Sequence, residues 1–203
     1  TPSNWLAERV KESYLSQYPM KVINNGIDTG IFKPTQSDFK ERYNISDKKV
    51  VLAVAAIWDR RKGLQDVIKL SENLDDSYRV VIVGLSQEQL DNLPSNVIGI
   101  TKTNNAKELA EIYSAADVFV NTTYEDNYPT VNLEAQACGT PVVTYNTGGS
   151  PEGVDEKTGI IVNAGDVEAM ADAVKKIRKP EHISARMFDK NVKYREYLEL
   201  YKS

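Results

Sequence analysis

Cysteine and histidine are almost absent from this 203-residue sequence, which contains only Cys138 and His182. A lone cysteine excludes an internal disulfide framework and any zinc site built from several cysteines, and a lone histidine argues against a histidine-based metal centre. We therefore expect no bound metal and no cofactor, with Cys138 a small core residue and His182 without a catalytic role.

Long hydrophobic runs and excess positive charge are also missing. The longest apolar run, Val50 to Trp58, has nine residues, whereas a membrane-spanning helix needs about twenty. The net charge is −4, which argues against a nucleic-acid binder that depends on bulk positive charge. The N-terminus has no signal-peptide pattern. We expect a soluble, cytoplasmic protein that does not bind nucleic acid.

The composition is that of a globular protein, with 41% apolar and 27% charged residues. Its length fits one large domain, or one domain with extensions. The sequence starts without Met at a helix-start signal, in which Ser3 can cap a helix with Leu6, Val10 and Tyr14 on one face. A chain that begins in the middle of a pattern is expected to be a fragment of a longer protein.

Short β-branched runs alternate with amphipathic stretches over most of the chain. The expected strands are Val50–Ile57, Arg79–Val83, Val97–Ile100, Asp117–Asn121, Pro141–Tyr145 and Gly159–Val162. The expected helices are Lys62–Leu74, Gln87–Leu93, Ala106–Ala115, Pro129–Cys138 and Asp166–Arg178. This alternation predicts an α/β fold, a doubly wound Rossmann-like parallel sheet with helices on both faces.

Two flanking segments complete no strand–helix–strand unit. Residues 1–34 contain the Ser3 helix and then a short expected strand with glycine and proline punctuation, and residues 183–203 contain a last helix rich in tyrosine and charge. We expect three parts, residues 1–34, 35–182 and 183–203, with a ligand site in the central part outside the carboxyl ends of its strands.

The loop after the first expected strand carries three consecutive cations, Arg60, Arg61 and Lys62. Cations beside the free N–H groups of a helix start favour anions, so this loop can clamp a phosphate or diphosphate. A solvated cationic loop has the same sequence, and on position alone the two interpretations are evenly balanced.

The segment after the fourth strand carries two acids, Asp126 and Glu134. Helical spacing places Glu134 on an apolar stripe with Val131 and Cys138, where a carboxylate needs a partner because unpaired burial is costly. Nothing local supplies that partner, whereas a ligand hydroxyl would. The alternatives are an internal salt bridge or a helix-start charge for Glu134, and a turn or cap role for Asp126.

Five motifs in order resemble the C-terminal, donor-binding domain of GT-B fold glycosyltransferases, in the retaining family 4, or glycosyl transferases group 1. They are VINNGIDTGIFKP (22–34), RRKGL (60–64), DNYPTVNLEAQACGTPVV (126–143), NTGGSPE (146–152) and KTGIIV (157–162). The resemblance covers essentially the whole chain and implies transfer of a hexosyl group from a nucleotide-diphosphate sugar, UDP- or GDP-linked, to a glycan or lipid-linked acceptor.

The resemblance also implies roles for single residues. Lys62 would contact the donor diphosphate and, with Asp126, which would lie near the transferred sugar, act in catalysis, while Glu134 would bind the ribose hydroxyls. The remaining substrate-binding positions would be Arg61, Asn127, Tyr128, Thr130, Val131, Ile100 and Thr101. The sequence departs from the family pattern in three places: Asp126 replaces a more usual Glu, Asn127-Tyr128-Pro129 replaces Gly-Phe-Gly, and Ile57 replaces an Arg, for which Arg60 or Arg61 would substitute.

In that family a separate N-terminal domain binds the acceptor, and this sequence lacks it. Residues 1–34 resemble the end of that domain and the interdomain connector, and residues 183–203 resemble the helix that crosses back. The resemblance implies that the chain alone binds nucleotide but is inactive, and that the full-length enzyme associates peripherally with a membrane. The alternatives are a nucleotide-sugar epimerase, a glycogen-type synthase, or a non-catalytic nucleotide-binding module.

Overall fold

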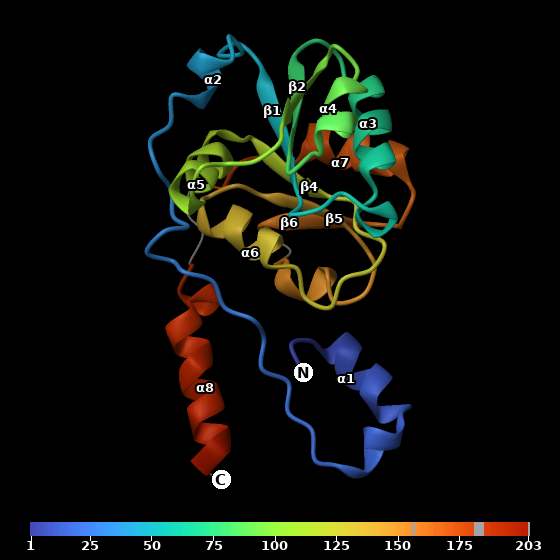
Figure 1. Ribbon diagram of the computed structural model, residues 1–203, viewed down its shortest axis with the longest axis vertical. Helices are drawn as coiled ribbons and strands as arrows, with labels where there is room; N and C mark the ends of the chain where they lie inside the picture. The colour runs from blue at the N-terminus through green and yellow to red at the C-terminus, as the bar shows by residue number, and fades with distance from the viewer. Residues whose placement is uncertain (156, 181–184, 203) are drawn as a thin grey trace.

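A six-stranded parallel sheet forms the centre of the computed structural model, which describes residues 1–155, 157–180 and 185–202 (Figure 1). The strands are β1 Lys49–Val54, β2 Tyr78–Val83, β3 Val97–Ile100, β4 Val118–Asn121, β5 Val142–Tyr145 and β6 Gly159–Val162. Their spatial order is β3-β2-β1-β4-β5-β6. The predicted doubly wound sheet is confirmed, and all six strands were predicted in the correct places.

Helices cover both faces of the sheet. They are α1 Asn4–Lys11, α2 Phe39–Arg42, α3 Leu64–Glu72, α4 Gln87–Asp91, α5 Ala106–Ala115, α6 Thr130–Ala137, α7 Val167–Lys176 and α8 Lys190–Lys202, with short 3-10 helices η1 Tyr14–Gln17, η2 Arg60–Lys62, η3 Pro151–Gly153 and η4 Ala185–Phe188. Alternate strand residues point to opposite faces. Leu52 of β1 therefore packs with α5 and α6, whereas Val51 packs with α3 and α7.

The strand order reverses between β1 and β4. From β1 the chain builds outward through β2 to β3, then returns to place β4 on the other side of β1, where Val51 is in register with Val118. Loops that leave the carboxyl ends of β1 and β4 consequently diverge to opposite faces, which opens a crevice between them. The fold thus brings residues 58–63, called here the cation loop, next to residues 122–129, called here the acid loop.

Of the expected strands, the first ends early and one near the N-terminus is absent from the described residues. The first ends at Val54 rather than Ile57, because beyond Ala55 the chain leaves the sheet and the Trp58 indole donates a hydrogen bond to the Val83 carbonyl at 2.9 Å. Ile57 is 74% exposed. The expected strand within residues 22–34 is absent from the described chain, where this connector makes only an isolated bridge between Ile27 and Asp189.

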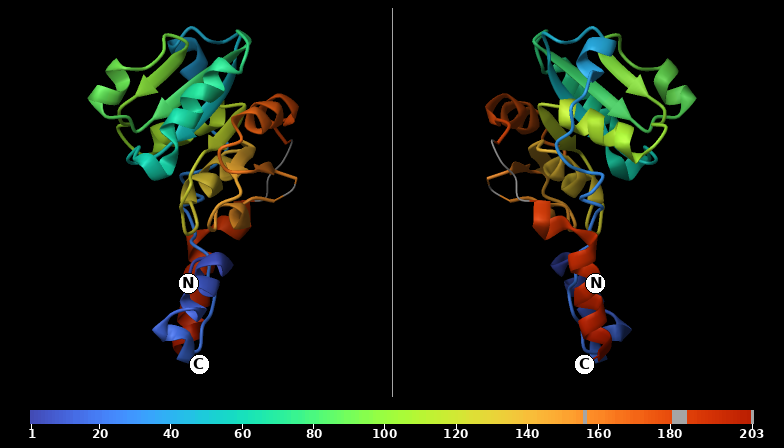
Figure 2. Two further views of the ribbon diagram at one scale, coloured as in Figure 1. Left: turned by 90° about the vertical axis from the view of Figure 1, so that its right-hand side faces the viewer. Right: turned by 90° about the vertical axis from the view of Figure 1, so that its left-hand side faces the viewer.

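The N- and C-terminal helices extend away from the sheet (Figures 1 and 2). Three tyrosines of α8 are exposed, by 58% (Tyr194), 37% (Tyr197) and 80% (Tyr201). The helix expected within residues 183–203 is divided into η4 and α8, while residues 182–184 and 203 lie outside the described residues.

Within the part of the chain that the structure describes, no helix is long and apolar enough to cross a membrane.

Candidate functional site

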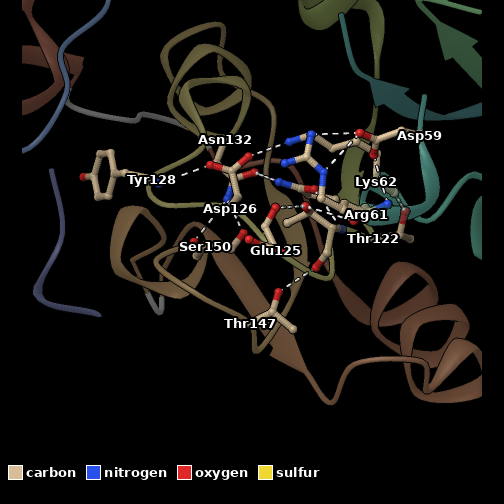
Figure 3. A network of polar contacts seen from close by, with 12 residues as sticks. Asp59, Arg61, Lys62, Thr122, Glu125, Asp126, Tyr128, Asn132, Thr147 and Ser150 are labelled. Atoms are coloured by element: carbon tan, nitrogen blue, oxygen red, sulfur yellow. Dashed lines mark hydrogen bonds and ion pairs between the residues drawn. The ribbon is translucent and has the colours of Figure 1, made fainter. Parts of the chain in front are cut away.

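A cleft of about 400 Å³ lies at the carboxyl ends of β1 and β4. It is bordered by the cation loop, the acid loop and the start of α6 (Figure 3). The lining residues are Val54–Asp59, Arg61, Lys62, Val120, Asn121, Asp126 and Tyr128–Val131. The cleft lies at the place predicted from the strand order. Six of the predicted site residues line it: Arg61, Lys62, Asp126, Tyr128, Thr130 and Val131.

Lys62 and Asp126 face each other across this cleft. The Lys62 ammonium lies 2.5 Å from Asp126 Oδ2, and the two side chains are 28% and 19% exposed. Asp126 Oδ1 also accepts a hydrogen bond from the Tyr128 backbone N–H at 3.1 Å. Residues 64 positions apart in the sequence therefore form one half-buried ion pair, which places a cation and an acid where a ligand would enter.

The backbone holds the cation loop against the end of β4. The Thr122 hydroxyl lies 2.9 Å from the Lys62 carbonyl oxygen and 3.0 Å from that of Gly63, and it is a donor to both. Gly63 has a φ of 69°, and a Cβ there would lie 2.3 Å from the Thr122 carbonyl oxygen. Only glycine fits this turn without strain, so the turn fixes where Lys62 points.

Arg61, rather than Arg60, borders the cleft. The Arg61 guanidinium donates to Asp59 Oδ2 through Nε at 3.1 Å and Nη2 at 2.8 Å. Asp59 first, and then Glu125 and Asp126, raise the pKa of Arg61. Arg60 is exposed and lies outside the lining. Of the two arginines that the sequence left open, Arg61 is the one placed to reach a ligand in the cleft.

Glu134 has a protein partner that the sequence did not reveal. The Tyr113 hydroxyl donates to Glu134 Oε2 at 3.1 Å, from α5 to α6. Burial raises the pKa of Glu134, while hydrogen bonds from Tyr113 and Thr130 oppose the increase. The expectation that nothing local supplies a partner for this acid is therefore wrong, because Thr130 lies only four positions before it. Glu134 lies one helical turn behind Thr130, outside the direct lining of the cleft.

The start of α6 faces the cleft through Thr130 and Val131. Pro129 precedes the helix, and among the described residues no side chain caps it. The first N–H groups of a helix have no intrahelical acceptor, so the backbone amides of Thr130 and Val131 are available at this side of the cleft. The Asn127 side chain, by contrast, is exposed outside the lining, and the Tyr128 ring is buried and points away from Asp126 (Figure 3).

Ile100 and Thr101 do not reach this cleft. They follow β3, which is separated from β1 by β2. Ile100 packs partly against the core, and its carbonyl oxygen accepts the Gly84 N–H at 2.8 Å, whereas Thr101 is exposed. The structure therefore groups the cation and acid loops but leaves these two predicted residues outside the described cleft.

The paired glycines Gly148 and Gly149 have a structural role. Residues 147–152, called here the glycine turn, pack against the acid loop, and the Gly149 N–H donates to the Asp126 carbonyl oxygen at 2.9 Å. A Cβ would lie 2.2 Å from the Asp126 carbonyl oxygen at Gly148 and 1.8 Å from that of Asn127 at Gly149. The glycines thus permit two loops to touch, and no ligand is needed to explain them.

Sequence reasoning missed several residues that build the site. Asn121 Nδ2 donates to Asn132 Oδ1 at 2.8 Å, and Asn132 Nδ2 donates to the Ser150 carbonyl oxygen at 3.1 Å. This buried amide pair joins the end of β4, helix α6 and the glycine turn. Tyr113 could have been found only as a polar group on the apolar face of its helix, a signal too common to single it out.

Residues 35–195 match the family described as glycosyl transferases group 1. Over 193 residues the chain is 30% identical to a Mycolicibacterium smegmatis protein named GDP-mannose-dependent alpha-(1-6)-phosphatidylinositol monomannoside mannosyltransferase, covering 85% of this chain and 50% of the relative. The chain thus spans about half the length of that curated relative.

Two solved structures share the fold. Sucrose-phosphate synthase from Thermosynechococcus elongatus superposes with a TM-score of 0.83 at 22% identity, over 100% of this chain and 57% of that one. The Anabaena protein Alr3699/HepE, solved in complex with UDP and glucose, gives a TM-score of 0.81 at 19% identity, over 100% and 62%. At these identities the likeness shows the fold alone.

Proposed function

Because this chain belongs to the glycosyl transferases group 1 family, we propose that its cleft binds the nucleotide-diphosphate sugar from which such an enzyme transfers a hexosyl group. The observation that carries the proposal is the meeting of Lys62 and Asp126, 2.5 Å apart, at the point where the strand order reverses. Open α/β sheets bind ligands at this point, and the family membership supplies the class of ligand.

The diphosphate is proposed to lie between Lys62, Arg61 and the start of α6. Two cationic side chains and the free N–H groups of Thr130 and Val131 offer donors and positive charge on neighbouring sides of the cleft. Fixed donors of this kind stabilise charge that develops on a leaving diphosphate. We propose that they act without a metal ion and without a further cofactor.

Asp126 and Glu134 are proposed to bind the two sugars of the donor. Asp126 lies at the cleft beside Lys62, where it would face the transferred hexose. Glu134 lies deeper, with one oxygen bound to Tyr113, and would bind the ribose hydroxyls. We propose transfer with retention of configuration to a glycan or lipid-linked acceptor.

The acceptor is proposed to bind a preceding domain that this chain lacks. The support is that the chain spans half of the mannosyltransferase it resembles, that α1 and α8 extend away from the sheet (Figure 2), and that α8 carries exposed tyrosines. We propose residues 1–34, 35–182 and 183–203 as the end of that domain with its connector, the donor domain and the returning helix. The chain alone would then bind donor but transfer no sugar.

Calorimetric titration of the chain with UDP, GDP and ADP, each in the presence of EDTA, tests the proposal. We expect at least one nucleoside diphosphate to bind with a Kd below 1 mM, about −4 kcal/mol, and chelator to leave that Kd unchanged. Lys69→Met, at an exposed lysine on α3, removes one positive charge outside the cleft and should bind nucleotide as wild type does. Absence of binding for all three nucleotides, or loss of binding with EDTA, would contradict the proposal.

A further inference from the structure

Glu152 joins the N-terminal helix to the body of the protein. Its Oε1 accepts the Trp5 backbone N–H at 2.7 Å, and its Oε2 accepts the Asn4 backbone N–H at 2.7 Å and the Asn4 side chain at 3.0 Å. The Leu6 N–H is bonded to Ser3 Oγ at 3.1 Å. The free amides of the first turn of α1 are thus satisfied by one carboxylate from residue 152 and one neighbouring hydroxyl.

The turn that carries Glu152 is fixed to the acid loop. The Gly149 N–H donates to the Asp126 carbonyl oxygen at 2.9 Å, and the Thr147 hydroxyl donates to the Thr123 carbonyl oxygen at 2.6 Å. Figure 3 shows Thr147 and Ser150 directly beside the residues of the acid loop. Because these backbones are in contact, a displacement of the glycine turn displaces the backbone of Asp126.

Tyr128 forms a second connection between Glu152 and Asp126. Its backbone N–H donates to Asp126 Oδ1 at 3.1 Å. Its ring is 8% exposed, lies near Gly153, and borders both the cleft and a second cavity of about 280 Å³ that Glu152 also lines. Burial first, and then the negative charge of Glu152, raise the pKa of Tyr128 to about 12. Tyr128 thus borders both cavities as a neutral side chain.

We propose that Glu152 is a positioning residue that couples the seating of α1 to the position of Asp126 in the cleft. The inference rests on the proposed function only in taking the cleft as the nucleotide site. The two states are α1 bound to Glu152 and α1 released from it. If the released state shifts the acid loop, then a change at Asp126 must alter the release of α1, because coupling between two sites is reciprocal.

Amide hydrogen exchange on the full chain tests this coupling without any ligand. The four chains are wild type, Asp126→Asn, Glu152→Ala and the double variant, with Glu168→Ala, at an exposed acid on α7, as the matched control. We expect Asp126→Asn to speed exchange of residues 4–7 at least about threefold in the wild-type background and to add nothing when Glu152 is already Ala. Glu152→Gln keeps an acceptor oxygen and should restore part of the response.

The outcome that overturns the coupling is additive behaviour: Asp126→Asn leaves exchange of residues 4–7 unchanged, or changes it equally with and without Glu152, while peptides of the acid loop do respond. Unchanged protection of β4 verifies that each variant is folded. In a second arm, the nucleoside diphosphate that binds should slow exchange of residues 4–7 in wild type but not in Glu152→Ala. If no nucleotide binds while the first arm succeeds, the proposed function fails and the coupling stands.

Discussion

Removing the Lys62 ammonium separates the contribution of the cleft's ion pair to stability from the contribution of Lys62 to nucleotide binding. Lys62→Met keeps the aliphatic stem and deletes the charge that lies 2.5 Å from Asp126 Oδ2. Breaking a fully buried pair costs about 3–5 kcal/mol and breaking an exposed pair up to about 1 kcal/mol. With side chains 28% and 19% exposed, the pair lies between these limits, so we expect the free energy of unfolding to fall by about 1–2 kcal/mol.

Nucleotide binding should respond more strongly than folding. A charged hydrogen bond from Lys62 to a diphosphate contributes about 1.5–3 kcal/mol, so its loss raises the Kd roughly 10- to 150-fold. Asp126→Asn removes the competing negative charge and keeps an oxygen that can accept the Tyr128 N–H. We therefore expect this variant to lose much less affinity for nucleoside diphosphate than Lys62→Met does, because the acid is proposed to face the sugar.

The assay is calorimetric titration with UDP, GDP and ADP, beside urea unfolding of the same samples, with Lys69→Met as the control. If Lys62→Met binds nucleotide as wild type does, Lys62 does not contact the diphosphate. If Asp126→Asn loses as much affinity as Lys62→Met, the ion pair is a structural bridge that keeps the cleft open, and the proposed separate roles of the two residues are wrong.

Three further predictions follow from burial and exposure. Burial raises the pKa of Glu134, so the stability that its proton confers is complete below the unfolded pKa of about 4.3 and is lost as pH rises through the folded pKa. Glu134→Gln should therefore be at least as stable as wild type at pH 7, lose that advantage near pH 4, and bind nucleotide about tenfold more weakly. A sharp loss of stability at unchanged affinity would contradict this. Burial also raises the pKa of Cys138 to about 12, so Ellman's reagent at pH 8 should find no reactive thiol in the folded chain and one per chain in guanidinium. Exposed Tyr194 and Tyr201 should cause concentration-dependent self-association in sedimentation experiments, and replacing both with Ser should reduce it.

The sheet was predictable because its strands are apolar on both faces. The bounds of Val97–Ile100, Gly159–Val162 and Ala106–Ala115 agree with the structure residue for residue. The end of β1 was not predictable, because residues 55–58 stay apolar after the strand ends. Where a strand stops depends on where its neighbours β2 and β4 stop pairing, and composition along one strand does not contain that information.

The site was predictable only where it follows from strand ends. The fold rule that loops meet at the reversal of strand order brings Lys62 to Asp126, and the resemblance supplied their roles. The Tyr113–Glu134 hydrogen bond depends on which faces of α5 and α6 meet, and the bonds from Glu152 to Asn4 and Trp5 span about 148 residues. No spacing rule reaches that far, so these contacts required the structure.

The contact between the glycine turn and the acid loop has a consequence for mutational scanning. A side chain at Gly148 or Gly149 meets a backbone carbonyl oxygen at 2.2 or 1.8 Å, so nearly every substitution there should reduce nucleotide binding, as substitutions at Lys62 are expected to do. A map of positions that do not tolerate substitution would therefore group residues proposed to contact the nucleotide with residues that only let two loops touch. Measuring the abundance of folded chain beside nucleotide binding would divide the two classes, with Lys62 variants abundant but weak in binding and Gly149 variants scarce.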